Sequence, residues 1–163
     1  KVRKNPFTTY FSNTQNNVVP MVNETRGIYV ENDSVVVDEL VVGDNDNLAA
    51  KVAVMCDADL LIICSDVNGL YTKNPRKFDD AEFIQRVESI DSNILAYADI
   101  TNNPIATGGM HTKIQAAQVA MQAGINTLIV NGRKASTFEK LKSAKTNGTL
   151  FVAKGIKEAF NAS

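Results

Sequence analysis

The stretch TGGMHTKIQAAQVAMQAGINTLIV, residues 107–130, decides the fold class. It opens on two glycines, continues as an apolar stripe at helical spacing that Gly124 closes, and ends in a β-branched run. Glycine lets backbone N–H groups approach a ligand closely, and a helix start favours an anion because its first N–H groups are unpaired. We therefore predict a helix over 110–123, a buried strand over 126–130, and an anion site at the loop.

The glycine pair also has an ordinary explanation. A Gly-Gly pair before a helix is often only a tight turn, and the Walker A spacing is absent, so residues 107–113 alone leave both readings open. His111 is the one histidine of the chain and has no Cys or His partners at ligand spacing, which predicts a solvated or capping side chain. Because no Ser-His-Asp or Cys-His arrangement can be inferred, nucleophilic catalysis is unsupported.

Helix and strand alternate through the second half of the chain. The pattern predicts a continuous apolar strand over 59–64 that is buried on both faces, a helix through 94–97, a loop over 99–106, an amphipathic helix over 136–143 and an edge strand over 148–152. This alternation is typical of an α/β fold, a three-layer α/β/α sandwich with a mainly parallel sheet and right-handed crossovers.

The first half carries weaker signals. Residues 1–17 suit a short helix or a loop, residues 18–22 a strand, residues 25–31 a hairpin or flap, and residues 34–42 are strongly β-prone. A length of 163 residues suits one domain, so we expect residues 1–163 to form a single domain.

Composition excludes several classes of function. The net charge is −1 and the pI about 5.8, so no positive field favours nucleic acid or an anionic membrane. No apolar run approaches the roughly 20 residues that a membrane span needs, and no signal-peptide pattern is present. Cys56 and Cys64 lie in apolar segments that we expect to be buried, which favours a reduced compartment and a cytoplasmic protein.

Asp44, Asn45 and Asp46 stand together in front of the apolar residues 48–55, which we predict as a helix. Asp and Asn are preferred capping residues, and one of them could serve as an ordinary N-cap. Three exceed what a cap needs, which favours a polar site. Carboxylates here could hold Mg²⁺ through water or orient lysines, and Asn45 could hydrogen-bond a polar substrate.

The segment 65–76 is long, polar and rich in turn residues, and it follows the predicted strand over 59–64. Ligands of open α/β sheets lie beyond the carboxyl ends of the strands, so nucleotide contacts are expected here. The alternative is a surface loop with a turn at Asn68-Gly69, in which Lys73, Arg76 and Lys77 are solvated charges.

The order and spacing of five segments resemble the glutamate 5-kinases of the amino acid kinase family. These segments are residues 32–35, 43–50, 65–76, 107–113 and 148–151, and the resemblance covers about residues 17–151. Uridylate kinases and aspartokinases share the segment 65–76, which therefore identifies only the superfamily. The Gly-Asp-Asn-Asp and Thr-Gly-Gly-Met-x-Thr-Lys motifs together are more specific, and they resemble those of the glutamate 5-kinases.

The resemblance implies transfer of the ATP γ-phosphoryl group to the glutamate side-chain carboxylate, the first step of proline synthesis, with ATP and Mg²⁺. Glutamate would be bound by Asn32, Asp33, Asp44 and Asn45. The nucleotide would be bound by Ser65, Asp66, Tyr71, Thr107, Gly108, Gly109, Met110, His111, Thr112 and Lys113. Lys113 would contact the transferring phosphate and Asp46 would organise the catalytic lysines; no residues are assigned as metal ligands. We expect small-molecule partners, glutamate and ATP, and a homo-oligomer, either a dimer or a tetramer.

Three departures from the family pattern bear on these expectations. The family's Lys-x-Gly-Ser segment does not occur within these 163 residues, so the chain resembles the C-terminal two-thirds of the kinase domain, and we expect no RNA-binding-like domain. Thr25 to Glu31 separates Asn23-Glu24 from Asn32-Asp33. Ile105-Ala106 stands where the family usually has a more glycine-rich segment before the Gly-Gly pair. The alternatives are a relative that phosphorylates a nucleoside monophosphate or aspartate, and a protein that binds nucleotide or oligomerises without transferring phosphate.

Overall fold

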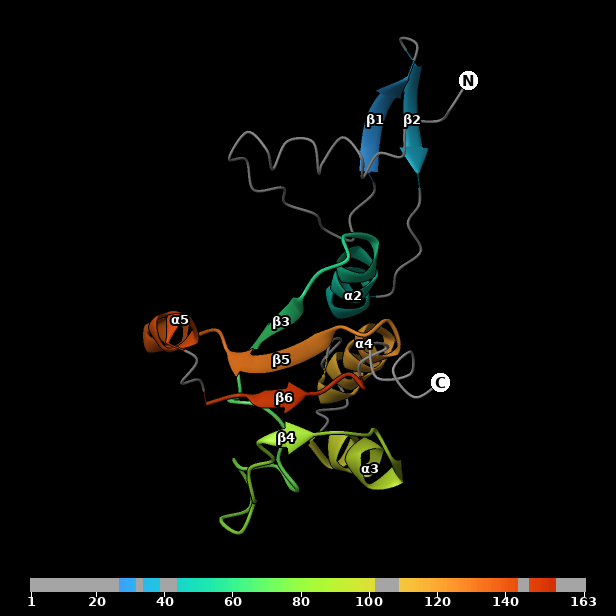
Figure 1. Cartoon of the computed structure of the whole chain (residues 1–163). Coiled ribbons are helices and arrows are strands. Elements are labelled where there is room, and N and C mark those ends of the chain that lie inside the picture. Colours follow the sequence, from blue (N-terminus) through green and yellow to red (C-terminus); the bar gives the residue numbers. More distant parts are fainter. Residues whose placement is uncertain (1–26, 32–33, 39–43, 102–108, 144–146, 155–163) are drawn as a thin grey trace, which may run out of the picture. The chain divides into compact units, whose positions relative to one another are not determined.

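The computed structural model describes residues 27–31, 34–38, 44–101, 109–143 and 147–154 (Figure 1). The chain divides into two compact units, Lys1–Val42 and Gly43–Ser163. In the first unit, β1 (Gly27–Glu31) pairs antiparallel with β2 (Ser34–Asp38). Residues 34–38 confirm part of the β-prone prediction, but the hairpin predicted within residues 25–31 was misplaced, because residues 27–31 form only its first strand. The predictions for residues 1–24 lie outside the described residues. The single domain stays a prediction.

The second unit contains a four-stranded sheet in the order β3-β5-β6-β4 (Figure 1). Its strands are β3 (Leu60–Ser65), β4 (Arg86–Val87), β5 (Asn126–Asn131) and β6 (Thr149–Phe151). β3 pairs parallel with β5 and β4 pairs parallel with β6, while β5 and β6 are antiparallel. Two of the three pairings are thus parallel, which confirms an α/β fold with a mainly parallel sheet.

Four helices flank this sheet: α2 (Asn45–Met55), α3 (Ser92–Thr101), α4 (Met110–Gln122) and α5 (Ala135–Lys142). All four confirm predicted helices, and Gly124 follows α4 with a φ of 80°, a backbone region that suits glycine at a helix end. α3 continues through Thr101, so the predicted loop over 99–106 was wrong for its first three residues. In Figure 1, α5 lies apart from the other three helices.

α2 and α4 pack together through alanines that are almost completely buried. Five of the six alanines on the two helices are buried, at 0 to 6% exposure: Ala50, Ala53, Ala116, Ala117 and Ala120. Small side chains allow two helix backbones to approach closely. Ile114 of α4 continues this core toward Ile129 and Phe151 of the sheet, all with 0% exposure. The packing places the start of α4 against α2, which matters for the candidate site.

β6 is an inner strand, so the predicted edge position was wrong. It hydrogen-bonds to β5 on one side and to β4 on the other, and its residues Thr149 and Phe151 have 0% exposure. The error arose because β4 was not predicted. Two residues within a charged stretch are too short to show an alternation of apolar and polar side chains.

β3 is buried on one face, not on both as predicted. Leu61 and Ile63 face the helix core at 8% and 4% exposure, whereas Leu60 and Ile62 are 42% and 41% exposed. A continuous apolar run cannot by itself distinguish a strand covered on one face from a strand covered on two. The same alternation leaves Cys64 exposed and Cys56 is only half-buried, so the expected burial of both cysteines was also wrong.

Candidate functional site

Asp44 caps helix α2. Its Oδ1 accepts a hydrogen bond from the backbone N–H of Asn47 at 2.8 Å, and its Oδ2 accepts one from Asn47 Nδ2 at 2.7 Å. Both carboxylate oxygens are therefore used within the first turn, which is the ordinary capping role. Asn45, the next residue, is exposed at the start of the helix. One acid thus satisfies the cap, and Asp46 remains available for a different contact.

Asp46 joins the starts of two helices. Its Oδ2 accepts hydrogen bonds from Lys113 Nζ at 2.8 Å and from Thr112 Oγ1 at 2.9 Å. The Lys113 and Asp46 side chains are only 11% and 17% exposed. The structure thus brings together two residues that are 67 positions apart in the sequence, and we call Asp46, Thr112 and Lys113 the Asp46 cluster.

The electrostatics of the Asp46 cluster explain why the acid is there. Lys113 lies in the first turn of α4, where the positive end of the helix dipole disfavours a cation. A nearly buried ammonium group also needs a partner, because an unpaired buried charge is strongly unfavourable. Asp46 supplies the opposite charge from the first turn of α2, where an acid is favoured. The result is a fixed ammonium group at a helix start, an arrangement suited to phosphate.

The described part of the glycine loop begins at Gly109, the N-cap of α4. Gly109 has extended backbone angles, and as a glycine it has no side chain with which to cap the helix. Met110 is 8% exposed and belongs to the core, and His111 is half-buried at the second helical position. Thr107 and Gly108 lie outside the described residues. The anion site at this helix start therefore stays a prediction.

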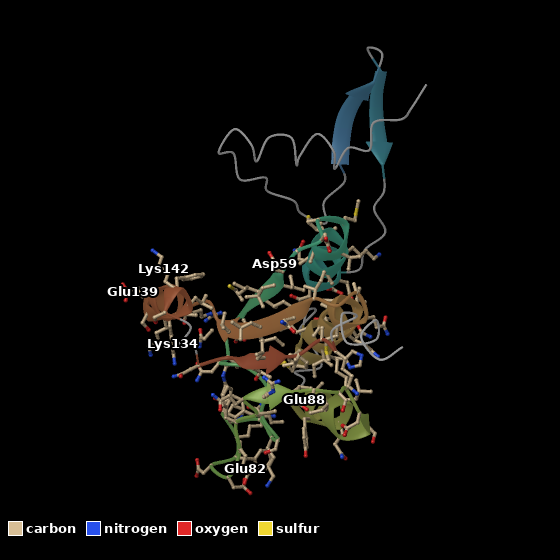
Figure 2. All side chains as sticks on the ribbon, viewed as in Figure 1. Asp59, Glu82, Glu88, Lys134, Glu139 and Lys142 are labelled. Carbon is tan, nitrogen blue, oxygen red and sulfur yellow. The ribbon has the colours of Figure 1, made fainter. Side chains whose placement is uncertain are left out.

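A second polar cluster lies where the parallel strands β3 and β5 end. Asn131 Nδ2 contacts the backbone oxygen of Asp66 at 3.4 Å and Asn68 Oδ1 at 3.3 Å. Lys134 Nζ donates to the same Asn68 oxygen at 3.1 Å, and the Gly132 N–H donates to the backbone oxygen of Ser65 at 2.9 Å. Lys134 lies at the α5 end of the sheet (Figure 2). We call these residues the strand-end cluster.

Asp66 forms an exposed ion pair within this cluster. Arg76 Nη2 lies 2.8 Å from Asp66 Oδ2, and the two side chains are 66% and 44% exposed. The hydrogen bond from Arg76 is the main cause that lowers the pKa of the Asp66 carboxyl, and the charges of Arg76 and Arg133 add to it. Tyr71 packs beside Phe83 with ring centroids 5.2 Å apart. Of the predicted residues, Ser65 ends strand β3, and Asp66 and Tyr71 lie in the loop that follows it.

Thr149 anchors this loop by hydrogen bonds and was not among the predicted site residues. Its hydroxyl accepts the Leu70 N–H at 2.8 Å and donates to the Ile84 backbone oxygen at 2.6 Å. Gly69 packs so closely over it that an added Cβ would lie 2.4 Å from Thr149 Oγ1. A lone threonine in a short strand gives no signal of this role, and Asn131 and Lys134 became relevant only once β5 was placed beside β3.

The predicted site is therefore brought together only in part. Asp46 meets Thr112 and Lys113, while Ser65 ends strand β3 and is followed by the loop that contains Asp66 and Tyr71. The predicted glutamate-binding residues Asn32 and Asp33 lie outside the described residues. Among the described residues, no three or more His, Cys, Asp or Glu side chains gather into a group that could hold a metal ion. Of the helices that the structure describes, none is long and apolar enough to cross a bilayer.

Comparison with curated proteins gives relatives along most of the chain. Glutamate 5-kinase 1 of Pseudoalteromonas translucida is 46% identical over 144 residues, 88% of this chain and 37% of that protein. Glutamate 5-kinase of Idiomarina loihiensis is 47% identical over 137 residues, 84% of this chain and 35% of that protein. The chain thus spans about a third of the length of these two relatives.

A solved structure and a family model complete the comparison. The carbamate kinase from Giardia lamblia bound to AMP-PNP superposes with a TM-score of 0.52 and 26% identity, covering 77% of this chain and 36% of that one. The model of the amino acid kinase family matches residues 1–131. Together with the mainly parallel sheet and the helices that flank it, this match shows that the chain belongs to the amino acid kinase family.

Proposed function

We propose that the protein transfers the γ-phosphoryl group of ATP to the side-chain carboxylate of glutamate, giving glutamyl 5-phosphate. The observation that carries the proposal is the nearly buried Asp46–Lys113 pair, whose Nζ and Oδ2 atoms are 2.8 Å apart at the start of α4. Two relatives named glutamate 5-kinase that share 46% and 47% identity supply the acceptor. Glutamate and ATP are thus the small molecules that the proposal requires, and the cytoplasm is where we expect the reaction.

Phosphoryl transfer asks a protein mainly for positioning and for stabilisation of charge. A carboxylate oxygen of glutamate attacks the γ-phosphorus, a new O–P bond forms, and the bond to the bridging oxygen breaks as ADP leaves. Lys113 places a positive charge beside the transferring group, and Asp46 fixes the direction of that charge. The N-terminus of α4, whose N-cap residue is a glycine, offers backbone N–H groups to the same phosphate oxygens.

Magnesium fits this scheme as part of the MgATP complex. Mg²⁺ keeps several waters and is commonly held by substrate phosphates together with one or two carboxylates. Asp44 already uses both carboxylate oxygens in its cap. Asp46 is therefore the carboxylate of this helix start that would face the MgATP complex. When bound, the ion neutralises charge on the phosphates.

The test is an acyl-phosphate trap. The full-length protein is incubated with MgATP, glutamate and hydroxylamine, and the expected hydroxamate is measured by its iron complex. Aspartate and a nucleoside monophosphate replace glutamate in parallel reactions. No hydroxamate with either carboxylate acceptor and no ADP formed with the nucleoside monophosphate, together with ATP binding by calorimetry, would contradict the kinase and leave a nucleotide-binding protein.

A lysine substitution tests the role of the Asp46 cluster. Lys113→Met should lower kcat by about 10²- to 10³-fold, because a preorganised charge is lost where negative charge develops. Lys51→Met is the matched control: it removes an exposed lysine from helix α2 and should leave kcat unchanged. Equal rates for the Lys113 variant and the control would separate this lysine from the chemistry.

A further inference from the structure

Thr112 stands between two acceptors at the start of α4. Its Oγ1 lies 2.9 Å from Asp46 Oδ2 and 2.9 Å from the backbone oxygen of Gly109. Neither acceptor has a proton to give, so the hydroxyl must donate to one of them. A carboxylate accepts the stronger hydrogen bond because it carries a charge, which favours donation to Asp46.

Thr112 and Lys113 are consecutive residues of one helix turn, and both donate to the same oxygen of Asp46. Two donors from α4 leave this carboxylate less freedom to rotate than one donor would. Thr112, which belongs to the same helix as Lys113, then fixes the Asp46 carboxylate, and this carboxylate fixes the direction of the Lys113 ammonium group. A lysine has four rotatable bonds, so a fixed partner matters for where its charge lies.

We propose that Thr112 is a positioning residue, which holds Asp46 so that Lys113 points at the transferring phosphoryl group. This proposal rests on the proposed function and deepens it. It also assigns Thr112 a different role from a direct nucleotide contact by its side chain. A hydroxyl that has given its only proton to Asp46 has none left for a phosphate oxygen.

The two roles predict different kinetics. A hydroxyl that only binds ATP would, when removed, raise KM for ATP and leave kcat unchanged, because uniform binding is lost. A hydroxyl that positions Lys113 would, when removed, lower kcat and leave KM for ATP nearly unchanged. Misplacement of a charge by about 1 Å can slow a reaction by about 100-fold, so we expect a loss between about 10- and 100-fold.

The experiment compares Thr112→Val and Thr112→Ser in the full-length protein. Thr112→Val keeps the shape and removes the hydroxyl, so kcat should fall by about 10- to 100-fold with KM for ATP within about twofold. Thr112→Ser keeps the hydroxyl and should restore kcat to within about threefold of the parent. An unchanged kcat in the valine variant, a loss confined to KM, or an equal kcat loss in the serine variant would each overturn the proposal.

A second measurement does not depend on turnover. The rate at which acetic anhydride modifies Lys113 is followed by peptide mass spectrometry and compared with that of the exposed Lys51. Without the Thr112 hydroxyl, the pair should loosen and Lys113 should react at least about threefold faster relative to Lys51, as expected when a partly buried group gains exposure. An unchanged ratio would overturn the proposal even if the parent protein showed no kinase activity. If Thr112→Val does not fold, Thr112→Ala takes its place in both measurements.

Discussion

The Asp46–Lys113 and Asp66–Arg76 pairs have the same nitrogen-to-oxygen distance, 2.8 Å, in very different surroundings. In the first pair Lys113 is 11% and Asp46 17% exposed, Thr112 is an additional donor, and two helix starts are joined. In the second pair Arg76 is 66% and Asp66 44% exposed, and both residues lie within one surface loop. The distance alone therefore says little about how much an ion pair contributes to stability. Water screens the exposed pair, whereas the two nearly buried charges depend on each other for stabilisation.

The largest expected effect comes from breaking the buried pair. Asp46→Ala leaves the Lys113 ammonium nearly buried without its carboxylate, and such a loss destabilises a protein by about 3–5 kcal/mol. Urea unfolding of the full-length protein, followed by circular dichroism, measures the change. Asp46→Leu combined with Lys113→Met removes both charges and should recover most of that stability. A double variant as unstable as Asp46→Ala would show that packing, not charge, dominates this helix contact.

Thr149 should contribute more to the free energy of unfolding than the surface charges of the strand-end cluster do. Thr149→Val removes the hydroxyl that pairs with the Leu70 N–H and the Ile84 carbonyl, and leaves one buried and one partly buried backbone group without this partner. A buried unsatisfied group costs about 1–3 kcal/mol and a partly buried one costs less, so a loss of about 2–4 kcal/mol is expected in the same unfolding experiment.

Thr149→Ser is the matched control for this prediction. It keeps the hydroxyl and removes only a methyl group, so the hydrogen bonds to residues 70 and 84 should persist and the loss should stay near 1 kcal/mol. Hydrogen exchange of the Leu70 amide should accelerate in the valine variant and stay slow in the serine variant. Equal exchange rates in the two variants would show that the hydroxyl does not anchor the loop.

The smallest effect is expected for the exposed pair. Arg76→Ala should change the free energy of unfolding at neutral pH by less than about 1 kcal/mol, because exposed ion pairs contribute little. It should also raise the pKa of Asp66 toward its usual range, since Arg76 is the main cause that lowers it. Carbon-13 NMR titration of the Asp66 carboxyl measures this change.

The pH dependence follows from the direction of that shift. A carboxyl whose pKa is lower in the folded state adds stability above its unfolded pKa, and that contribution is lost as pH falls through the folded value. The parent should therefore lose slightly more stability than Arg76→Ala between neutral pH and pH below about 4. Arg86→Ala, which removes an arginine from the exposed Arg86–Glu88 pair, is the control for adding an alanine. An Asp66 titration identical in parent and Arg76→Ala would contradict the assignment of the shift.

Local patterns were reliable where a residue's neighbours in sequence decide the outcome. The helix at 110–122 follows from its apolar spacing and from Gly124, and the cap of α2 follows from the acid and amide side chains before it. Outcomes that depend on distant neighbours were not predictable in this way. The inner position of β6 depends on the short strand β4. The exposure of Leu60 and Ile62 on β3 depends on which elements pack against each face of the sheet.

The sequence by itself determined the α/β class, the helix starts at α2 and α4, and the presence of acids and a lysine there, because capping, periodicity and glycine conformation act within a few residues. Only the tertiary structure decided which of those acids faces the lysine. Asp44 turns back to its own helix, while Asp46 meets Thr112 and Lys113 where α2 and α4 pack together through buried alanines. The energy of a charge pair depends on burial, and burial is a property of the packed chain.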